Sequence, residues 1–308
     1  MSIKRWRVAL GVAVFAALST ASMAWATLLT PTLVVGGSGS QISPAATPAA
    51  TYIVYSASRP GFPNAYDAYV KPAGQPRVKV NNSGIAFAGG IDGTTFIYQH
   101  ISSGHSDIGL YDVGTQTRSL PTGVNTSAWE WSPTISGDWI LFSRQNPNAT
   151  PVSDRVVLRN EMTSVTRVLD DAAGTPDRIL TAGQVNGDYA SWDRYTPSAH
   201  TGTVRLYQIS TQHTDIVQLP IGKIQYASSV NAAGNLFYVR SGIGCGKQVV
   251  IREIIVGVSD TALAALPPGY DVSKTFAVDE GGGVTSLYFD RFNCATGKGA
   301  DVYKLTVS

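Results

Sequence analysis

The sequence has 308 residues, with 23 lysines and arginines against 21 aspartates and glutamates, so its formal net charge is only +2. A charge this close to zero provides no basic face for nucleic acid or an anionic membrane surface, which excludes nucleic acid as a partner class. The 44% of hydrophobic residues excludes a chain that is disordered throughout, and two cysteines are too few for a disulfide-dense mini-protein.

The first 26 residues have the pattern of a bacterial secretory signal peptide. Met1 to Arg7 carries three basic residues and no acid, Val8 to Ala21 is apolar or small, and Ala24-Trp25-Ala26 gives a small-x-small cleavage pattern. We therefore expect a mature chain that begins near Thr27 and is secreted or extracytoplasmic, in the periplasm or cell envelope. The alternative is an uncleaved anchor, because Val8 to Ala26 is just long enough to cross a bilayer. Only in that case do we expect the protein to contact a membrane.

Residues 27–50 are rich in Ser, Thr, Pro, Gly and Ala, a composition typical of a linker, and contain one short apolar run, Leu33 to Val35. Residues 51–308 differ, with short runs of β-branched and aromatic residues separated by Gly, Asn, Asp and Pro. This pattern predicts an all-β domain. A short helix at Ser259 to Leu266 is the only exception that we expect.

Six segments of residues 51–308 repeat one pattern: a small or polar strand, a glycine-bearing turn, a strand with an aromatic residue, a variable loop and a third strand. The aromatic residues, here called the anchors, are separated by 43 to 51 residues. They are Tyr55, Tyr98, Phe142, Trp192, Tyr238 and Phe289. This period suits a β-propeller blade, because each small twisted sheet must bury both faces against its neighbours. We predict a β-propeller with six four-stranded blades; a pair of β-sandwiches or an open sheet stack is the alternative.

The last repeat ends at Ser308 after its third strand. A missing fourth strand would leave exposed sheet edges, which proteins avoid. We therefore predict that Leu33 to Val35 supplies this strand and joins the two ends of the chain.

One repeat carries a recognisable motif. Trp131 to Arg144 begins Trp-Ser-Pro and continues through Ser136-Gly137-Asp138 to Ile140-Leu141-Phe142-Ser143. This stretch resembles the TolB-type, WD-like propeller repeat, and Ser43-Pro44 is a fainter echo of it. The resemblance extends from about residue 40 to the end of the chain. It implies a secreted bacterial binding scaffold; such repeats also accompany separate hydrolase domains, for which this chain has no residues left.

The loops between the second and third strands should lie on one face of the propeller, together with the connections between blades. Such loops usually carry the function of a rigid scaffold. Two of the longest are residues 145–153 and 195–202. We therefore expect ligand contacts from Asn146, Tyr195 and His200.

A basic residue recurs near each anchor. These residues are Arg59, His100, Arg144, Arg194, Arg240 and Arg291. One interpretation is a cationic ring that attracts a carboxylate, a phosphate or an acidic glycan. The interpretation that we favour is a charge pair within each hairpin, because an acid enters the third strand almost opposite in four repeats. These acids are Asp67, Asp107, Asp154 and Asp301. Arg194 and Arg240 lack such an acid and are the remaining ligand-binding candidates.

Cys245 and Cys294 occupy corresponding loops of the last two repeats. In an oxidising compartment, a disulfide between adjacent blades is the simplest interpretation. His100, His105 and Asp107 lie within eight residues, but their spacing fits no established ligand pattern. We expect no metal site and no cofactor.

Two functions remain. The first is a non-catalytic, monomeric, extracytoplasmic propeller that binds a protein or glycan partner at the cell surface through loops on one face, and the absence of an acid/base motif favours it. The alternative is a propeller enzyme, a glycan hydrolase or lyase, whose carboxylates come from different blades and meet only after folding. The first carboxylates to consider would be Asp92, Asp138, Asp188 and Asp193.

Overall fold

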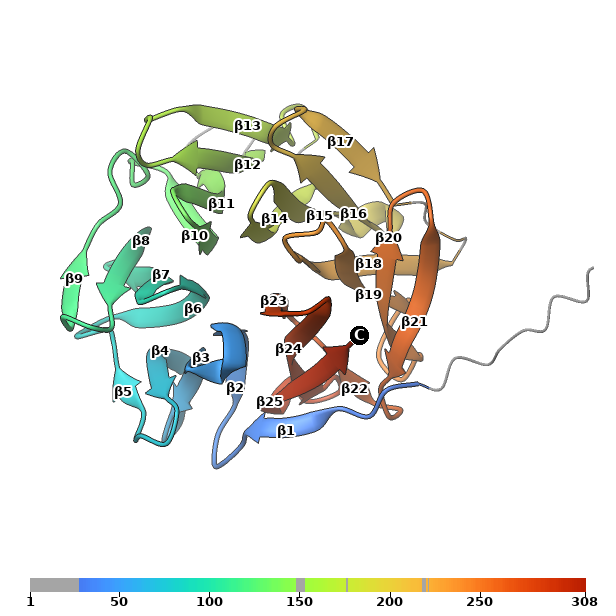
Figure 1. Ribbon diagram of the computed structural model, residues 1–308, viewed down its shortest axis with the longest axis horizontal. Helices are drawn as coiled ribbons and strands as arrows, with labels where there is room; N and C mark the ends of the chain where they lie inside the picture. Colours follow the sequence, from blue (N-terminus) through green and yellow to red (C-terminus); the bar gives the residue numbers. More distant parts are fainter. Residues whose placement is uncertain (1–27, 148–152, 176, 218–219, 221) are drawn as a thin grey trace, which may run out of the picture.

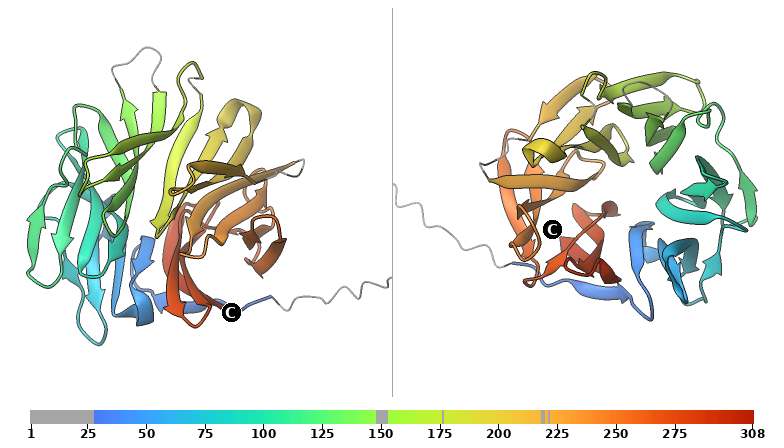
Figure 2. Two further views of the ribbon diagram at one scale, coloured as in Figure 1. Left: turned by 45° about the horizontal axis from the view of Figure 1, so that its top comes forward. Right: turned by 180° about the vertical axis from the view of Figure 1, so that it is seen from behind.

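The computed structural model describes residues 28–147, 153–175, 177–217, 220 and 222–308. Their strands form six antiparallel sheets arranged around a central axis (Figure 1), which confirms the six-bladed all-β prediction. Figure 2 shows the same radial arrangement from behind. The helical segments of this part of the chain are two short 3-10 turns, η1 (Pro48–Ala50) and η2 (Pro197–Ala199).

Blades 1 to 5 each consist of four strands in chain order, and the first strand of each lies nearest the axis (Figure 1). Blade 1 contains β2 (Gln41–Ala46), β3 (Tyr52–Arg59), β4 (Phe62–Pro72) and β5 (Val78–Lys79). Blade 2 contains β6 (Ile85–Asp92), β7 (Thr95–Ser102), β8 (His105–Asp112) and β9 (Thr117–Ser119). Blade 3 contains β10 (Trp129–Ser136), β11 (Trp139–Asn146), β12 (Ser153–Asn160) and β13 (Thr166–Asp171). Blade 4 contains β14 (Ile179–Asn186), β15 (Tyr189–Thr196), β16 (Thr201–Gln208) and β17 (His213–Ile216). Blade 5 contains β18 (Lys223–Val230), β19 (Leu236–Gly242), β20 (Val249–Ile255) and β21 (Ser259–Ala265).

Blade 6 is built from both ends of the chain. Its strands are β23 (Thr275–Gly281), β24 (Val284–Asn293), β25 (Lys298–Val307) and, outermost, β1 (Thr32–Val35), with β22 (Tyr270–Asp271) paired to the end of β24. Leu33 lies opposite Tyr303 and Val35 opposite Val302, and Figure 1 shows β1 in blue alongside β25 in red. The predicted closure by an N-terminal strand is confirmed.

Two expectations about single elements are wrong. Residues 41–46, which composition placed in the linker, form β2, so the propeller begins before Thr51. Residues 259–265 form β21 instead of a helix, because they pair along β20 and bury Leu263 and Ala264. Sheet pairing and burial thus override the helix propensity of the alanines. The predicted signal peptide, residues 1–26, lies outside the described residues. Among the described residues, no helix has the length and apolar character needed to cross a membrane.

The repeated sequence pattern corresponds to the blade core. All six anchors lie on the second strand of their blade and are at most 6% exposed. The first strands of blades 1 to 5 each contain a β-bulge. In blades 1 and 3 the bulge holds the Ser-Pro pairs, and Ser43 and Ser132 have the left-handed φ values of 54° and 51°. The motif behind the TolB-like resemblance is therefore the bulge of the inner strand.

In five of the six blades, the side chain of the residue that follows the anchor takes part in a hydrogen-bonded link to the next blade. In four blades this side chain accepts a hydrogen bond from an inner-strand amide of the following blade. The pairs are Ser56 with Ala88 (2.7 Å), Ser143 with Ala182 (2.8 Å), Asp193 with Ala227 (2.7 Å) and Asp290 with Ser43 (3.1 Å). In blade 2, Gln99 donates to Ser106, which donates to the carbonyl of Glu130 in blade 3. Blade 5 has Val239 at this position, which offers no acceptor side chain.

Blades 5 and 6 are joined by other side chains and by a covalent link. The Thr275 hydroxyl donates to the Ala227 carbonyl at 2.6 Å, and the Asn231 amide donates to the Thr285 hydroxyl at 3.0 Å. Cys245 and Cys294 form a disulfide with their Cα atoms 5.5 Å apart, as the sequence predicted.

Candidate functional site

Antiparallel pairing places the loops between second and third strands, and the connections between blades, on one face of the ring, here called the loop face. A pocket of about 380 Å³ opens on this face between blades 2 and 3. Blade 2 contributes Gln99, Ile101, Gly104, His105 and Ser106, and blade 3 contributes Trp129, Trp131 and Gln145. We call it the interblade pocket.

Strand alternation explains why two tryptophans line this pocket. Trp129 and Trp131 are alternate residues of β10, so their side chains leave the strand on the same side. Trp129 is 39% exposed, whereas Glu130 between them is fully buried. Gln145 lies opposite Trp129 in the register of β10 and β11, which brings an amide beside the indoles. The bulge after Trp131 ends the regular pairing at this point.

Among the described residues, no aspartate, glutamate, lysine or arginine lines the pocket itself, although the carboxylate of Asp107 contacts His105 at its edge. Glu130 accepts a hydrogen bond from Arg144 Nε at 2.8 Å and one from the Thr126 hydroxyl at 2.7 Å, so the buried carboxylate and the guanidinium neutralise each other. The polar lining then consists of Gln99, Gln145, Ser106 and His105. These groups offer hydrogen-bond donors and acceptors without a fixed charge.

The two arginines expected to lack an acid both have one. Arg194 donates to Asp170 of β13, with 3.1 Å between Nε and Oδ2, and Arg240 pairs with Asp260 of β21 at 2.9 Å. Both acids come from outer strands, whereas the sequence comparison considered only acids at the start of the third strand. Arg252 shares Asp260, at 2.8 Å, and lines a separate pocket of about 240 Å³ together with Arg240 and Lys223.

Of the four hairpin charge pairs expected from the sequence, the Arg59–Asp67 pair forms, at 2.6 Å. Arg144 pairs with Glu130 instead of Asp154. Arg291 lies over the rings of Tyr303 and Tyr270 instead of pairing with Asp301.

His100 lies opposite Asp107 in register, but its ring nitrogen is 3.0 Å from the Ser83 carbonyl, and Asp107 contacts His105. The basic residues near the anchors are thus engaged one by one with separate partners. This arrangement agrees with pairing better than with a cationic ring.

The other sequence candidates lie on the loop face of blades 3 and 4. Asn146 ends β11, Tyr195 is near the end of β15, and His200 follows η2 with φ of 48°. Part of the loop after Asn146, residues 148–152, is outside the described chain. Within the described residues, Asn146, Tyr195, His200, Arg194 and Arg240 do not line the interblade pocket.

Side chains bridge the inner strands around the axis. The amide of Gln184 in blade 4 both donates to and accepts from the backbone of Ala277 in blade 6, at 2.7 and 2.8 Å. Lys274 Nζ donates to the Gly89 carbonyl of blade 2 at 2.8 Å, and desolvation lowers the pKa of this lysine to about 8. A pocket of about 220 Å³ near the first-to-second-strand turns is lined by inner-strand residues that include Asp92 and Asp279.

Three of the four carboxylates considered for catalysis, those of Asp92, Asp188 and Asp193, have structural partners. Asp92 accepts from the Gly137 amide at 2.5 Å, and Asp188 accepts from the Ser210 amide at 2.8 Å. Asp193 is buried at the junction of blades 4 and 5, and desolvation raises its pKa to about 6 although two backbone amides donate to it. Asp138 lies in the turn between β10 and β11.

Sequence reasoning did not identify the interblade pocket. It named His105 only when considering a metal site, Gln145 only as the start of a long loop and Trp131 only as part of the repeat motif. It did not consider Trp129 and Gln99. The available signal was the Trp-x-Trp pair at the start of the one repeat with a full motif, since a second tryptophan on the same side of a strand near a loop is unusual.

No family model matches this chain, and no curated protein is similar to it in sequence. Solved structures are similar in fold. TolB from Acinetobacter baumannii has a TM-score of 0.56 and 15% identity, over 84% of this chain and 64% of that one. A putative TolB from Agrobacterium tumefaciens has a TM-score of 0.56 and 12% identity, over 87% and 90% of the two chains. An oligogalacturonate lyase in complex with manganese has a TM-score of 0.54 and 11% identity, over 92% and 97%. At these identities the similarity concerns the propeller fold.

Proposed function

We propose that this protein is a non-catalytic extracytoplasmic β-propeller that binds a neutral oligosaccharide in the interblade pocket. The observation that carries the proposal is the pair of indoles, Trp129 and Trp131, beside the amides of Gln99 and Gln145. The flat face of a pyranose ring presents C–H groups that pack on an indole, while its hydroxyl groups need both donors and acceptors. A primary amide provides both.

The size and exposure of the pocket support this proposal. Its volume, about 380 Å³, lies toward the lower end of the range of roughly 300 to 1,000 Å³ that is usual for small-molecule sites. Trp129 is 39% exposed although it belongs to the inner strand of a blade. Large aromatic side chains on a rigid strand lose little entropy on binding, which makes them effective contact residues.

The charge of the pocket favours a neutral ligand. An acidic sugar such as galacturonate needs an available cation, but Arg144 is already paired with Glu130. Although the fold is similar to that of an oligogalacturonate lyase, we therefore do not propose oligogalacturonate as the ligand of this pocket.

The partners of the acidic residues favour binding over catalysis. Asp92, Asp188 and Asp193 hold backbone amides, and Gln184 bridges two inner strands near the axis. The enzyme alternative needs two carboxyl groups about 5 to 10 Å apart beside a bound glycan. The disulfide supports an extracytoplasmic location.

The test is isothermal titration of the untagged mature protein with cellohexaose, chitohexaose, maltohexaose and trigalacturonate. We expect binding of at least one neutral oligosaccharide without cleavage of it. Trp129→Ala and Trp131→Ala should each weaken this binding at least tenfold. Phe62→Ala is the matched control, because Phe62 is an aromatic residue of blade 1 that is 67% exposed.

Three results would refute the proposal: no binding of any neutral oligosaccharide, binding that both tryptophan variants retain, or cleavage of the bound sugar. Melting curves of the variants show whether a loss of binding reflects a loss of folded protein.

A further inference from the structure

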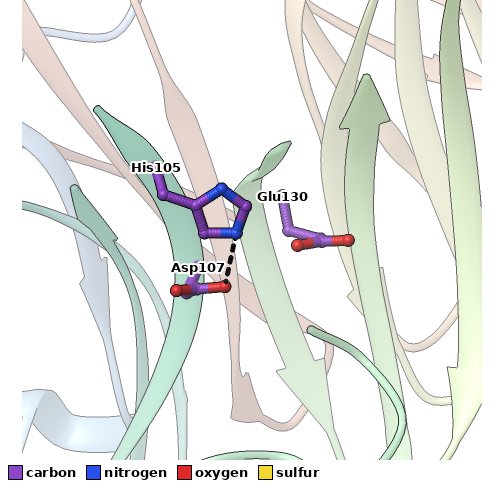
Figure 3. A group of neighbouring side chains, drawn as sticks. All are labelled: His105, Asp107 and Glu130. Carbon is purple, nitrogen blue, oxygen red and sulfur yellow. Dashed lines mark ion pairs between the residues drawn. The ribbon is translucent and has the colours of Figure 1, made fainter. Parts of the chain in front are cut away.

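Three metal-ligating side chains meet between blades 2 and 3, next to the interblade pocket (Figure 3). His105 and Asp107 are alternate residues of β8 and lie on the same side of it, and Glu130 comes from β10 of the next blade. One potential ligand atom from each residue lies within 4.8 Å of the other two. The imidazole lies between the two carboxylates in Figure 3.

The distances around His105 resemble those between the ligands of one cation. His105 Nε2 is 3.3 Å from Asp107 Oδ1 and 3.2 Å from the Thr126 carbonyl oxygen. For a first-row cation with bonds of about 2.1 Å, adjacent ligand atoms are roughly 3.0 to 3.4 Å apart in octahedral or tetrahedral geometry. Both distances from His105 Nε2 therefore fall within the range found between adjacent ligands of one cation.

Glu130 is placed as a further ligand. Its side chain is fully buried, and Oε1 accepts from Arg144 Nε and the Thr126 hydroxyl. Within the described part of the chain, Oε2 accepts a single, long hydrogen bond, 3.4 Å, from the Thr126 amide. A buried carboxylate oxygen usually has a closer partner. The bonds to Oε1 would orient the carboxylate in the way that outer-shell hydrogen bonds orient metal ligands.

We propose that His105, Asp107 and Glu130, together with the Thr126 carbonyl, form a binding site for a divalent transition-metal cation, zinc or manganese. A set of one imidazole and three oxygen ligands suits these ions, whereas calcium and magnesium prefer oxygen alone. The side chains of His105 and Asp107 are 37% and 38% exposed, so an ion reaches the site from solvent.

This site departs from the sequence expectation of no metal, because its buried ligand comes from a different blade. It goes beyond the proposed glycan binding and does not depend on it, because the argument for a neutral ligand concerns the pocket without a bound cation. The bound cation would link blade 2 to blade 3 at the edge of the interblade pocket.

The chain contains a matched control. His213 and Asp215 form a second His-x-Asp pair with the same Nε2 to Oδ1 distance, 3.3 Å. In the described part of the chain, the only cluster with a third ligand is the one around His105. The two pairs differ in the presence of Glu130 and in the exposure of the histidine, which is 37% for His105 and 67% for His213.

The experiment is calorimetric titration of the untagged, metal-free mature protein with zinc, manganese and calcium chlorides, without sugar. We expect one zinc or manganese ion per chain, an affinity at least tenfold lower in His105→Ala and in Asp107→Asn, and no change in His213→Ala. The metal should also raise the melting temperature of the unaltered protein but not that of His105→Ala.

The proposal is overturned by the absence of zinc and manganese binding, by binding that His105→Ala retains, or by equal losses in His105→Ala and His213→Ala. Binding of calcium alone would also overturn it, because the imidazole would then have no role. These outcomes are distinct from a failure of glycan binding, which is measured with sugar and with the tryptophan variants.

Discussion

Asp67 shows how one side chain in a blade couples stability to pH. Burial disfavours its ionised form, but hydrogen bonds from Arg59, Asn81 and Lys79 outweigh this effect and lower its pKa to about 2 from the model-peptide value of 3.8. The distances are 2.6 Å to Arg59, 2.9 Å to Asn81 and 2.9 Å to Lys79. The folded-state pKa is below the unfolded-state value, so the stabilisation is present above about pH 4 and is lost as the pH falls through 2.

We predict that Asp67→Asn lowers the free energy of unfolding by about 2 kcal/mol at pH 7. The difference from the unaltered protein should shrink as the pH falls from 4 to 2, because the carboxylate of the unaltered protein becomes protonated. Urea unfolding at several pH values measures it. Asp171→Asn is the control. The Asp171 carboxylate pairs with Arg155 but is more exposed than that of Asp67, so its loss should change the unfolding free energy by less than about 1 kcal/mol. A difference for Asp67→Asn that is independent of pH would contradict this account.

Among individual residues, the sequence was sufficient to predict some side-chain contacts but not others. Arg59 and Asp67 are eight residues apart in one hairpin, so the strand pattern was enough to predict their pair. The acids for Arg194 and Arg240 lie 24 and 20 residues away on outer strands, whose register the sequence does not specify. The interblade pocket and the cluster around His105 combine residues of two blades, and their closeness depends on how neighbouring sheets pack.

At the scale of elements, each blade is connected to the next through the residue after its anchor, except at Val239. The Cys245–Cys294 disulfide joins blades 5 and 6 there and closes a loop of 49 residues. In the chain-entropy model, a loop of this length stabilises the folded state by up to roughly 4 kcal/mol. The disulfide thus adds a covalent link to a junction that is also held by hydrogen bonds from Thr275 and Asn231.

We predict that the Cys245→Ser, Cys294→Ser double variant unfolds with a free energy lower by about 2 to 4 kcal/mol than the oxidised protein. Reductant should destabilise the unaltered protein by a similar amount and leave the double variant unchanged. Chemical denaturation with and without reductant measures both effects. Equal stability of the oxidised and reduced protein would show that the link contributes nothing.

The first three strands of blades 2 to 5 could be predicted because alternation, turn glycines and anchors coincide in them. Two elements could not. Residues 41–46 contain a single β-branched residue, Ile42, and form β2 through pairing with Ile53 and Val54 of β3. Residues 259–265 are alanine-rich and form a strand only because β20 presents an edge for them.

At the scale of the whole molecule, β1 closes the ring by pairing with β25. Without it, blade 6 would leave the edge of β25 unpaired and the two ends of the chain unconnected. Its four residues are few, but they replace an exposed sheet edge with backbone pairing.

We predict that a chain of residues 39–308 melts several degrees below a chain of residues 27–308, because the pairing of β1 with β25 is lost. Differential scanning calorimetry measures this difference. An unchanged melting temperature would show that the propeller does not need this closure.

The central claim is that the ring presents one site for an oligosaccharide, the interblade pocket between blades 2 and 3. Hydrogen–deuterium exchange of the mature protein with and without its best-binding neutral oligosaccharide tests this most directly. The account predicts protection of residues 99–106, 129–131 and 145, with little change elsewhere. Protection centred on residues 195–202, on Arg240 or on the pocket lined by Asp92 and Asp279 would contradict it.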